Sequence, residues 1–439
     1  MKIMKIPAVE SDWRLAISGG VLWLLAISAP LVESDAYRYA VLALAVGALL
    51  TSGVVHHRKP DWLAWLCIGW AVYAAGRFLG IYLFTATHDR GSSEFLYIFP
   101  VFFPVLGLAL WLYRAYIEPV LAVFFAVALL LLLVTTQYGL VIAGERASPL
   151  LHNNSIHGSV GTGMVMIGAF YWFMYYVEKG HLRSWLSRWA MVAAPLVIAL
   201  CLFNIYGAKS KGVWLAVSFA VPFMFLSVLF YMNRKVGMIF AAIVAAAIIC
   251  GVYSVKDNLW QTAGPTITAF SAMLDHDLTG DYINNALTDT IQSEATPPSM
   301  NQRLRLWSNA WEIVTSTPMF GAGSSWLRLW QTTRYPDVGY DLLHNGYLEV
   351  AVRYGLFGLT IFAVMLSAFL HRAHKAYAYG LISRSALLCY VALIGFFLVT
   401  LLSNSNNRLA IGESFFLMVG AVAFYCTERL SRHVQGQTA

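Results

Sequence analysis

Charged residues are scarce in this sequence. Asp, Glu, Lys and Arg make up 12% of its 439 residues, against about 25% in an ordinary globular domain. Hydrophobic residues make up 59%, so a water-soluble fold with a polar surface is excluded. Apolar runs of about twenty residues, the length that spans a hydrocarbon core about 30 Å thick, recur along nearly the whole chain. The composition therefore indicates an integral membrane protein made of helices.

Cysteine is scarce as well. All five cysteines lie inside apolar runs, where a thiol behaves as a small hydrophobic group, and none is near a loop in which it could pair. We expect neither disulfide bonds nor a metal site at Cys67, Cys201, Cys250, Cys389 and Cys426.

Signals for processing or for a second domain are missing too. The first long apolar run begins near Leu15 and lacks a small-residue cleavage site followed by a soluble region, so we expect a retained span and not a secretory signal. No internal repeat, low-complexity tract or second soluble domain is evident. We therefore expect residues 1–439 to form a single membrane domain.

The apolar runs predict an all-α polytopic fold with about twelve transmembrane helices. Charges, prolines or polar clusters bound each run. Arg77 lies well inside the third run, an unusual place for a charge. The predicted spans cover residues 14–32, 37–55, 61–84, 95–113, 117–142, 156–177, 189–207, 212–232, 236–255, 346–370, 385–402 and 408–427.

The distribution of cations predicts the orientation. With both termini in the cytoplasm, Lys and Arg gather on the inner connections, which is the positive-inside pattern. The formal net charge of +7 then reflects topology and is no argument for nucleic acid binding. The inner cations are Arg58 with Lys59, Arg114, Lys179 with Arg183 and Arg188, Arg234 with Lys235, and Arg372 with Lys375 and Arg384.

The longest stretch outside the predicted spans is 256–345, between the ninth and tenth helices. It is polar over 271–300 and becomes amphipathic from Asn301 to Thr317. We expect a small helical cap there, on the outer face.

Several cations lie on outer connections, against the usual bias. A single outer Lys or Arg is most simply explained by snorkelling to the headgroups. A group of them favours an anionic partner held close to the lipid surface, and a pyrophosphate meets that need. The group comprises Arg146 with His152 and His157, Lys209 with Lys211, and Arg303 with Arg305.

The string His344-Asn345-Gly346-Tyr347-Leu348-Glu349 stands where the cap gives way to an apolar run. The ordinary pKa of histidine, about 6.5, lets it take a proton from a sugar hydroxyl near neutral pH. A histidine that only bonds to backbone at the membrane interface is the structural alternative. We take His344 as the candidate base.

Four strings together carry a family resemblance: Arg303-Leu304-Arg305-Leu306-Trp307, Pro318-Met319-Phe320-Gly321-Ala322-Gly323, His344 to Glu349, and Gly355-Leu356-Phe357-Gly358. In order and spacing this part of the chain, roughly 205 to 358, resembles the O-antigen ligase and polymerase superfamily. A Ser-Arg-Gly step of that family is matched by Ser210-Lys211-Gly212. Lysine there keeps the charge but loses the bidentate fork that suits phosphate oxygens.

The resemblance implies a membrane glycosyltransferase that takes a glycan from undecaprenyl pyrophosphate at the periplasmic face of the bacterial inner membrane. It also implies that the reaction uses no nucleotide sugar, no metal ion and no other cofactor. The sequence has no His-Glu-x-x-His, and its one Asp-x-Asp, Asp275-His276-Asp277, lies away from the basic group.

The predicted mechanism assigns roles to the singled-out residues. His344 would deprotonate an acceptor hydroxyl that attacks the anomeric carbon with inversion. Asn345 would orient the imidazole, Glu349 would be structural or orient the cap, and His152 and His157 are secondary candidates for the site. The cations expected to clamp the pyrophosphate are Arg146, Lys209, Lys211, Arg303 and Arg305.

Three activities within the family stay open: joining O-antigen to lipid A-core, polymerising repeat units, and transferring glycan to protein. The length of the chain, without a long C-terminal extension, argues against the third, and a moderate cap suits a ligase that admits a lipid A-core acceptor. A lipid-linked glycan transporter is a further alternative, with Arg77 and the outer cations lining a path for an anionic lipid. A monomer with membrane lipid in a lateral groove is the default.

Overall fold

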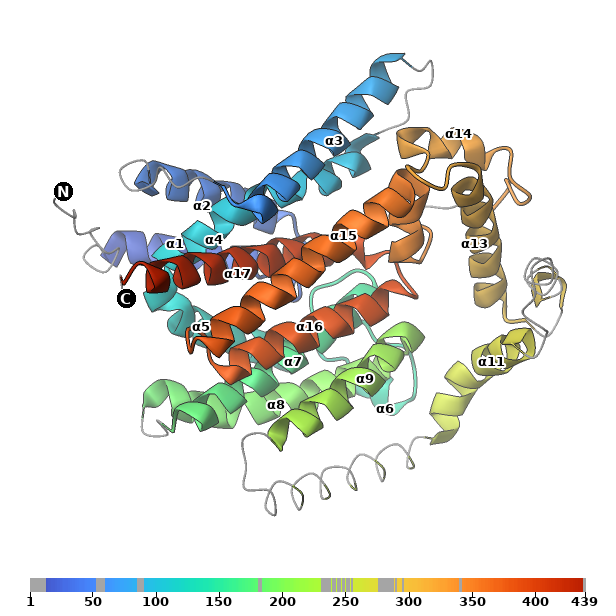
Figure 1. The fold of residues 1–439 in the computed structure, drawn as a ribbon. Coiled ribbons are helices and arrows are strands. Elements are labelled where there is room, and N and C mark those ends of the chain that lie inside the picture. The colour runs from blue at the N-terminus through green and yellow to red at the C-terminus, as the bar shows by residue number, and fades with distance from the viewer. Residues whose placement is uncertain are drawn as a thin grey trace.

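The computed structural model describes residues 13–52, 60–84, 91–180, 184–229, 256–274, 296–338 and 342–436, with isolated positions between 238 and 293. Over these ranges the chain is helical, with turns and one isolated bridge between Val32 and Leu151. The long helices form a bundle, and α13 and α14 lie at one of its ends (Figure 1). The α-fold predicted from the apolar runs is confirmed.

The described residues form α-helices and 3₁₀-helices in the following order. The α-helices are α1 (Trp13–Ala26), α2 (Ala36–Ser52), α3 (Trp62–Phe84), α4 (Phe103–Leu112), α5 (Ile117–Thr135), α6 (Tyr138–Ile142), α7 (Ser155–Lys179), α8 (Trp185–Gly207), α9 (Lys211–Val228), α11 (Lys256–Leu274), α13 (Pro298–Ser316), α14 (Trp326–Trp330), α15 (Gly346–Ala378), α16 (Arg384–Leu401) and α17 (Ala410–Val434). The 3₁₀-helices are η2 (Gly91–Phe102), η3 (Arg114–Tyr116), η4 (Gly323–Ser325) and η5 (Asn406–Arg408).

Nine helical segments of the described part are long and apolar enough to cross a membrane. Two shorter apolar helices, Ala16–Ala26 and Ala36–Thr51, coincide with the first two predicted spans. The predicted span 236–255, which contains Cys250, lies almost entirely outside the described residues, as do Arg58, Lys59, Arg183, Arg234, Lys235 and Asp275 to Asp277. These helices identify the chain as a multi-pass membrane protein. The predicted count of twelve transmembrane helices stays a prediction.

Three predicted spans contain a break or a change of helix type in the structure. The run 95–113 begins as the 3₁₀-helix η2, which contains Pro100, before α4 starts with a proline in its first turn. The run 117–142 is divided because Thr136 has an extended backbone, which ends α5. The third, 346–370, continues as α15 to Ala378 and is interrupted at Gly355. Apolar composition gives no sign of any of these breaks.

The interruption of α15 joins two of the motif strings. Gly355 has φ +61° and ψ −157°, a backbone conformation that is essentially restricted to glycine. It turns the N–H groups of Leu356 and Phe357 out of the helix, and they donate to the carbonyls of Pro318 and Met319, both at 2.9 Å. The turn after α13 is thereby fixed to the membrane helix that follows it in the sequence.

Helix α7 is the most deeply buried of the membrane-length helices. It packs against α8, α16 and α9, and Asn154 caps its first turn by accepting from the Ile156 N–H at 2.8 Å. The start of α7 is thereby capped, and its His157 lies within electrostatic range of His344, the candidate base.

Candidate active site

His344 lies two residues before α15 and has a left-handed backbone, with φ +51°. Its Nδ1 lies 3.1 Å from Oδ1 of Asn404, in the turn between α16 and α17. Asn345 was expected to orient the imidazole, and that expectation is corrected. Its Oδ1 caps α15 by accepting from the N–H groups of Tyr347 and Leu348 at 3.0 and 3.1 Å.

A chain of hydrogen bonds fixes which atom Asn404 presents to the imidazole. The Thr400 hydroxyl donates to the Phe397 carbonyl at 2.7 Å and accepts from Nδ2 of Asn406 at 3.0 Å. Oδ1 of Asn406 therefore accepts from Nδ2 of Asn404 at 2.7 Å. This leaves Oδ1 of Asn404 as the acceptor for His344, so Nδ1 carries the ring proton and Nε2 the lone pair.

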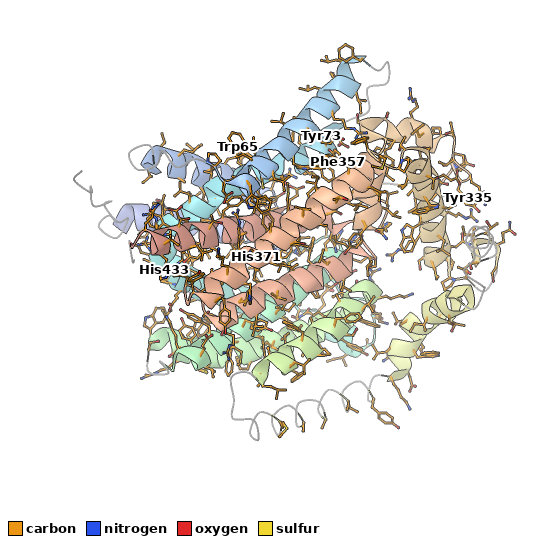
Figure 2. The ribbon with its side chains drawn as sticks, viewed as in Figure 1. Trp65, Tyr73, Tyr335, Phe357, His371 and His433 are labelled. Carbon is orange, nitrogen blue, oxygen red and sulfur yellow. The ribbon has the colours of Figure 1, made fainter. Side chains whose placement is uncertain are left out.

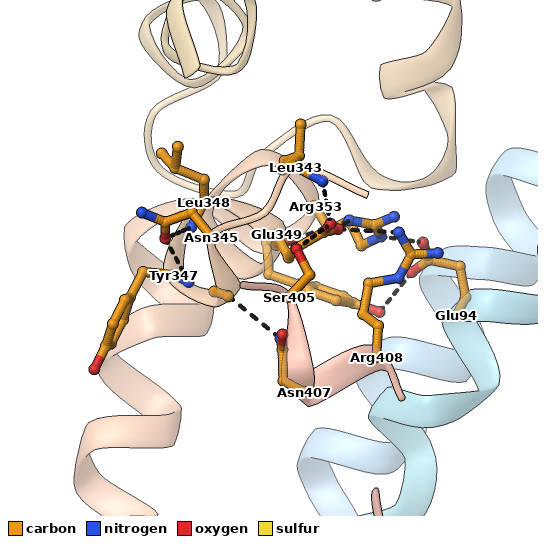
Figure 3. Close-up of polar contacts among 12 residues, drawn as sticks. Glu94, Leu343, Asn345, Tyr347, Leu348, Glu349, Arg353, Ser405, Asn407 and Arg408 are labelled. Carbon is orange, nitrogen blue, oxygen red and sulfur yellow. Dashed lines mark hydrogen bonds and ion pairs between the residues drawn. The ribbon is translucent and has the colours of Figure 1, made fainter. Parts of the chain in front are cut away.

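Glu349 holds the neighbours of both members of this pair, Leu343 and Ser405, in place (Figure 3). It is completely buried, and its Oε1 accepts from the Leu343 N–H and from the Ser405 hydroxyl, each at 2.8 Å. Leu343 precedes His344 and Ser405 follows Asn404. One carboxylate therefore fixes the two segments that supply the imidazole and the amide, which fits the structural role predicted for Glu349.

The charge of Glu349 is balanced in the same interior. Its Oε2 accepts from Arg353 at 2.6 Å and from Arg408 at 3.1 Å. Arg353 is only 1% exposed and also pairs with Glu94 at 3.0 Å (Figure 3). Two cations and two carboxylates thus neutralise one another, which a buried charge requires.

Arg77, the charge inside the third span, bonds to the motif turn. It donates to the carbonyls of Phe320 and Gly321, the second at 2.5 Å, and to the Tyr73 hydroxyl at 2.8 Å. This contact assigns Arg77 to holding the turn Pro318 to Gly323 against α3.

Helix α13 carries two of the predicted cations, Arg303 and Arg305. Trp307 donates from Nε1 to the Leu343 carbonyl at 2.9 Å, which anchors α13 beside His344. Arg303 lies about one turn before Trp307, and its burial lowers the pKa of its guanidinium, which stays protonated in proteins. The guanidinium of Arg305 lies 5.4 Å from the Tyr335 ring centre, and its Nε is buried without a partner in the described part.

Helix α9 brings Lys211 to the same place. A Cβ on Gly212 would lie 1.7 Å from Oγ of Ser403, so only glycine permits this approach of α9 to the turn that contains Asn404. Lys211 and Arg303 are close enough for their charges to repel. A polyanion placed between these two cations would relieve that repulsion.

Residues 195–363 match a family model described as O-Antigen ligase. These residues belong to the O-antigen ligase and polymerase superfamily. No curated protein matches the chain significantly. The family region includes α9, α13, the motif turn and His344, whereas α7 and the turn from Ser403 to Arg408 lie outside it.

The remaining predicted site residues lie near the start of α7 or beside the connection that precedes it. Ala147 donates to the Gly207 carbonyl at 2.9 Å, which places the connection of exposed Arg146 beside that of Lys209. Nδ1 of His157 lies 3.6 Å from Oε1 of Glu33, and His157 also interacts electrostatically with His344.

His152 is placed differently. It is 7% exposed, and its Nε2 lies 3.2 Å from the Pro30 carbonyl, which makes Nε2–H a donor. Burial lowers the pKa of its imidazole. This geometry fits a structural histidine that holds the α1–α2 connection against the start of α7.

Residues outside the family region were missed from the sequence. Asn404, Ser405, Asn406 and Arg408 contact His344 or Glu349 directly or through one another. The signal available was the polar string Ser403-Asn404-Ser405-Asn406-Asn407-Arg408 between two apolar runs at the end where His344 lies.

Proposed function

We propose that this protein is an O-antigen ligase that transfers a glycan from undecaprenyl pyrophosphate to lipid A-core oligosaccharide. The observation that carries the proposal is the imidazole of His344, oriented by Asn404, on the same end of the bundle as the neighbouring cations Lys211 and Arg303. A base beside cations is what the attack of a hydroxyl on a pyrophosphate-linked sugar requires.

In the proposed reaction an acceptor hydroxyl oxygen attacks the anomeric carbon of the donor glycan. Its proton passes to Nε2 of His344, and the bond from the anomeric carbon to the pyrophosphate oxygen breaks with its electron pair. The products are glycosylated lipid A-core and undecaprenyl pyrophosphate, with the anomeric centre inverted. The network through Asn406 and Thr400 supports Nε2 as the basic nitrogen.

Fixed cations would meet the charge of the departing pyrophosphate, where partial exclusion of water strengthens the interaction. Lys211 and Arg303 would make the nearest contacts, with Arg305, Arg146 and Lys209 around them. This arrangement would act without a metal ion. The undecaprenyl chain would lie in the membrane beside α9.

We further propose that the site faces the periplasm and that both termini lie in the cytoplasm, in a bacterial inner membrane. In support, α1 begins and α17 ends at the end of the bundle remote from α13 (Figure 1). Lys179, Lys375 and Arg384 lie on helix ends remote from His344, which agrees with the positive-inside pattern.

The runner-up is a polymerase of the same superfamily, in which the acceptor would be another carrier-linked glycan. The transporter alternative relied on Arg77 to line a path for an anionic lipid, and it is weakened because Arg77 donates to backbone carbonyls instead. Purified protein supplied with undecaprenyl-pyrophosphate glycan and lipid A-core in EDTA separates these possibilities. Glycosylated lipid A-core supports the ligase, and lengthened carrier glycans identify a polymerase. If well-folded protein forms neither product, both the ligase and the polymerase proposals are contradicted.

A further inference from the structure

A cavity of about 890 Å³ lies between α5, α7, α16 and α17, and its lining runs to the end of α7 and the start of α16, which are the helix ends remote from His344. It begins beside Pro30, below the buried His152, and follows α7 from Met164 to Lys179. At 1.5 Å per residue this stretch of α7 is about 22 Å long, well over half of a hydrocarbon core about 30 Å thick.

The walls of the cavity are mainly apolar. They include Leu121, Phe124, Phe125, Trp172 and Leu393, with the rings of Phe125 and Trp172 stacked 4.6 Å apart. Polar and charged lining residues gather at the end formed by the last turn of α7 and the start of α16. The cavity therefore combines a long apolar space with one polar end, the form that suits a molecule with hydrocarbon chains and a headgroup.

The polar end carries an excess of positive charge. Four cations line it, Arg114, Lys179, Arg384 and Arg429, against two carboxylates, Glu118 and Glu178.

Both carboxylates are already engaged. Glu118 pairs with Lys179 at 2.5 Å. Glu178 caps α16, accepting from the N–H groups of Arg384 and Ser385, each at 2.9 Å. The guanidinium of Arg384 donates to the Tyr377 hydroxyl, and that of Arg429 to the Tyr425 hydroxyl, each at 3.1 Å. Arg384 and Arg429 thus place guanidinium charge beside tyrosine hydroxyls at the polar end, where an anion would add charge-assisted hydrogen bonds.

We propose that this cavity binds an anionic diacyl phospholipid from the membrane leaflet opposite the glycosyl-transfer site. The acyl chains fill the space along α7, and the headgroup phosphate contacts Arg384 and Arg429. The donor's pyrophosphate is excluded as the occupant, because the cations proposed to hold it lie at the other end of α7. The binding is independent of catalysis, and its test does not require activity.

Native mass spectrometry of the full-length protein, titrated with phosphatidylglycerol or phosphatidylcholine, tests this site. One phosphatidylglycerol is expected to stay bound at lipid concentrations at which phosphatidylcholine does not. The double variant Arg384→Gln with Arg429→Gln is expected to weaken phosphatidylglycerol binding about tenfold or more. Arg188→Gln is the matched control, because Arg188 is an exposed cation at the same end of the bundle and outside the cavity lining.

A second variant tests the cavity itself. Leu393→Trp adds bulk inside the apolar part and is expected to lower the occupancy of either lipid while the charges remain. Thermal unfolding and gel filtration establish that each variant is folded. Equal losses in Arg188→Gln and the double variant would overturn the proposal, as would unchanged binding in Leu393→Trp, since lipid bound loosely around the bundle gives both results.

Discussion

Oδ1 of Asn404 lies 3.1 Å from Nδ1 of His344, a contact between residues 60 positions apart. The amide oxygen of Asn404 accepts a hydrogen bond from the ring N–H, because the amide nitrogen donates to Oδ1 of Asn406. In the proposed reaction Asn404 is thus a positioning residue, which would act on the acceptor hydroxyl through the imidazole.

Removing this amide should lower turnover without weakening the binding of either substrate. For Asn404→Ala we expect kcat to fall about 100-fold, the scale of a misplaced catalytic group, with KM nearly unchanged. For Asn404→Asp the new carboxylate favours the imidazolium. The base then stays protonated to higher pH, so the acid limb of the kcat profile moves up by about one pH unit or more. A profile that coincides with that of the wild type would show that Asn404 does not act through His344.

Glu349 should be essential for stability. Glu349→Gln leaves Arg353 and Arg408 inside the protein with one compensating carboxylate fewer, and the expected loss in free energy of unfolding is about 3 to 5 kcal/mol. Asp35→Asn is the control, since the Asp35 side chain is 62% exposed in its pair with Arg38 and a surface pair contributes about 0 to 1 kcal/mol. Denaturant unfolding in detergent measures both. Similar losses in the two variants would refute the buried-network interpretation.

A paired substitution tests the contact between α9 and the turn that contains Asn404. Gly212→Ala drives a methyl group into the Ser403 side chain, whose Oγ would lie 1.7 Å away and Cβ 2.7 Å away, so transfer activity should fall. Ser403→Gly removes both clashing atoms. The double variant should regain most of the activity lost by Gly212→Ala, and no recovery would mean that the damage arises elsewhere.

Gly355→Ala should damage the junction of α15 with the motif turn. The new Cβ would lie 2.5 Å from the Met319 carbonyl oxygen, in a backbone conformation that alanine avoids. Gly380→Ala has a similar φ, +68°, but meets nothing within 4 Å, so its cost is only the strain of about 1 to 2 kcal/mol. Thermal unfolding of the two variants separates strain from collision. The first should be clearly less stable, and equal stability would contradict the fitted junction.

The sequence predicted those features that depend on residues close together in the chain. Apolar runs indicated the helices, and His344 and the cations at positions 211 and 303 stood out because their chemistry is unusual beside apolar runs. The contacts of His344 with Asn404, and of Glu349 with Arg408, were not predictable, because residues about 60 apart meet only through tertiary packing. Asn345 was given the role of Asn404 because it is adjacent in sequence, although a residue that caps a helix points its side chain at the helix backbone.

The helix breaks were missed for a related reason. Gly355 lies in an apolar run and reads as a tolerated glycine within a helix. Its unusual conformation is stabilised by the hydrogen bonds that the N–H groups of the next two residues donate to the carbonyls of Pro318 and Met319. The sequence placed the two motif strings in order but gave no indication that one is bonded into the other.

The most direct test of the account is the transfer of glycan to lipid A-core in EDTA by His344→Ala. His371→Ala is the control, because His371 is an exposed histidine on the same helix, α15, far from α13 (Figure 2). The account predicts that His371→Ala keeps nearly wild-type turnover while His344→Ala loses about 100-fold or more, the contribution of a general base. Turnover by folded His344→Ala at the rate of the control would contradict it.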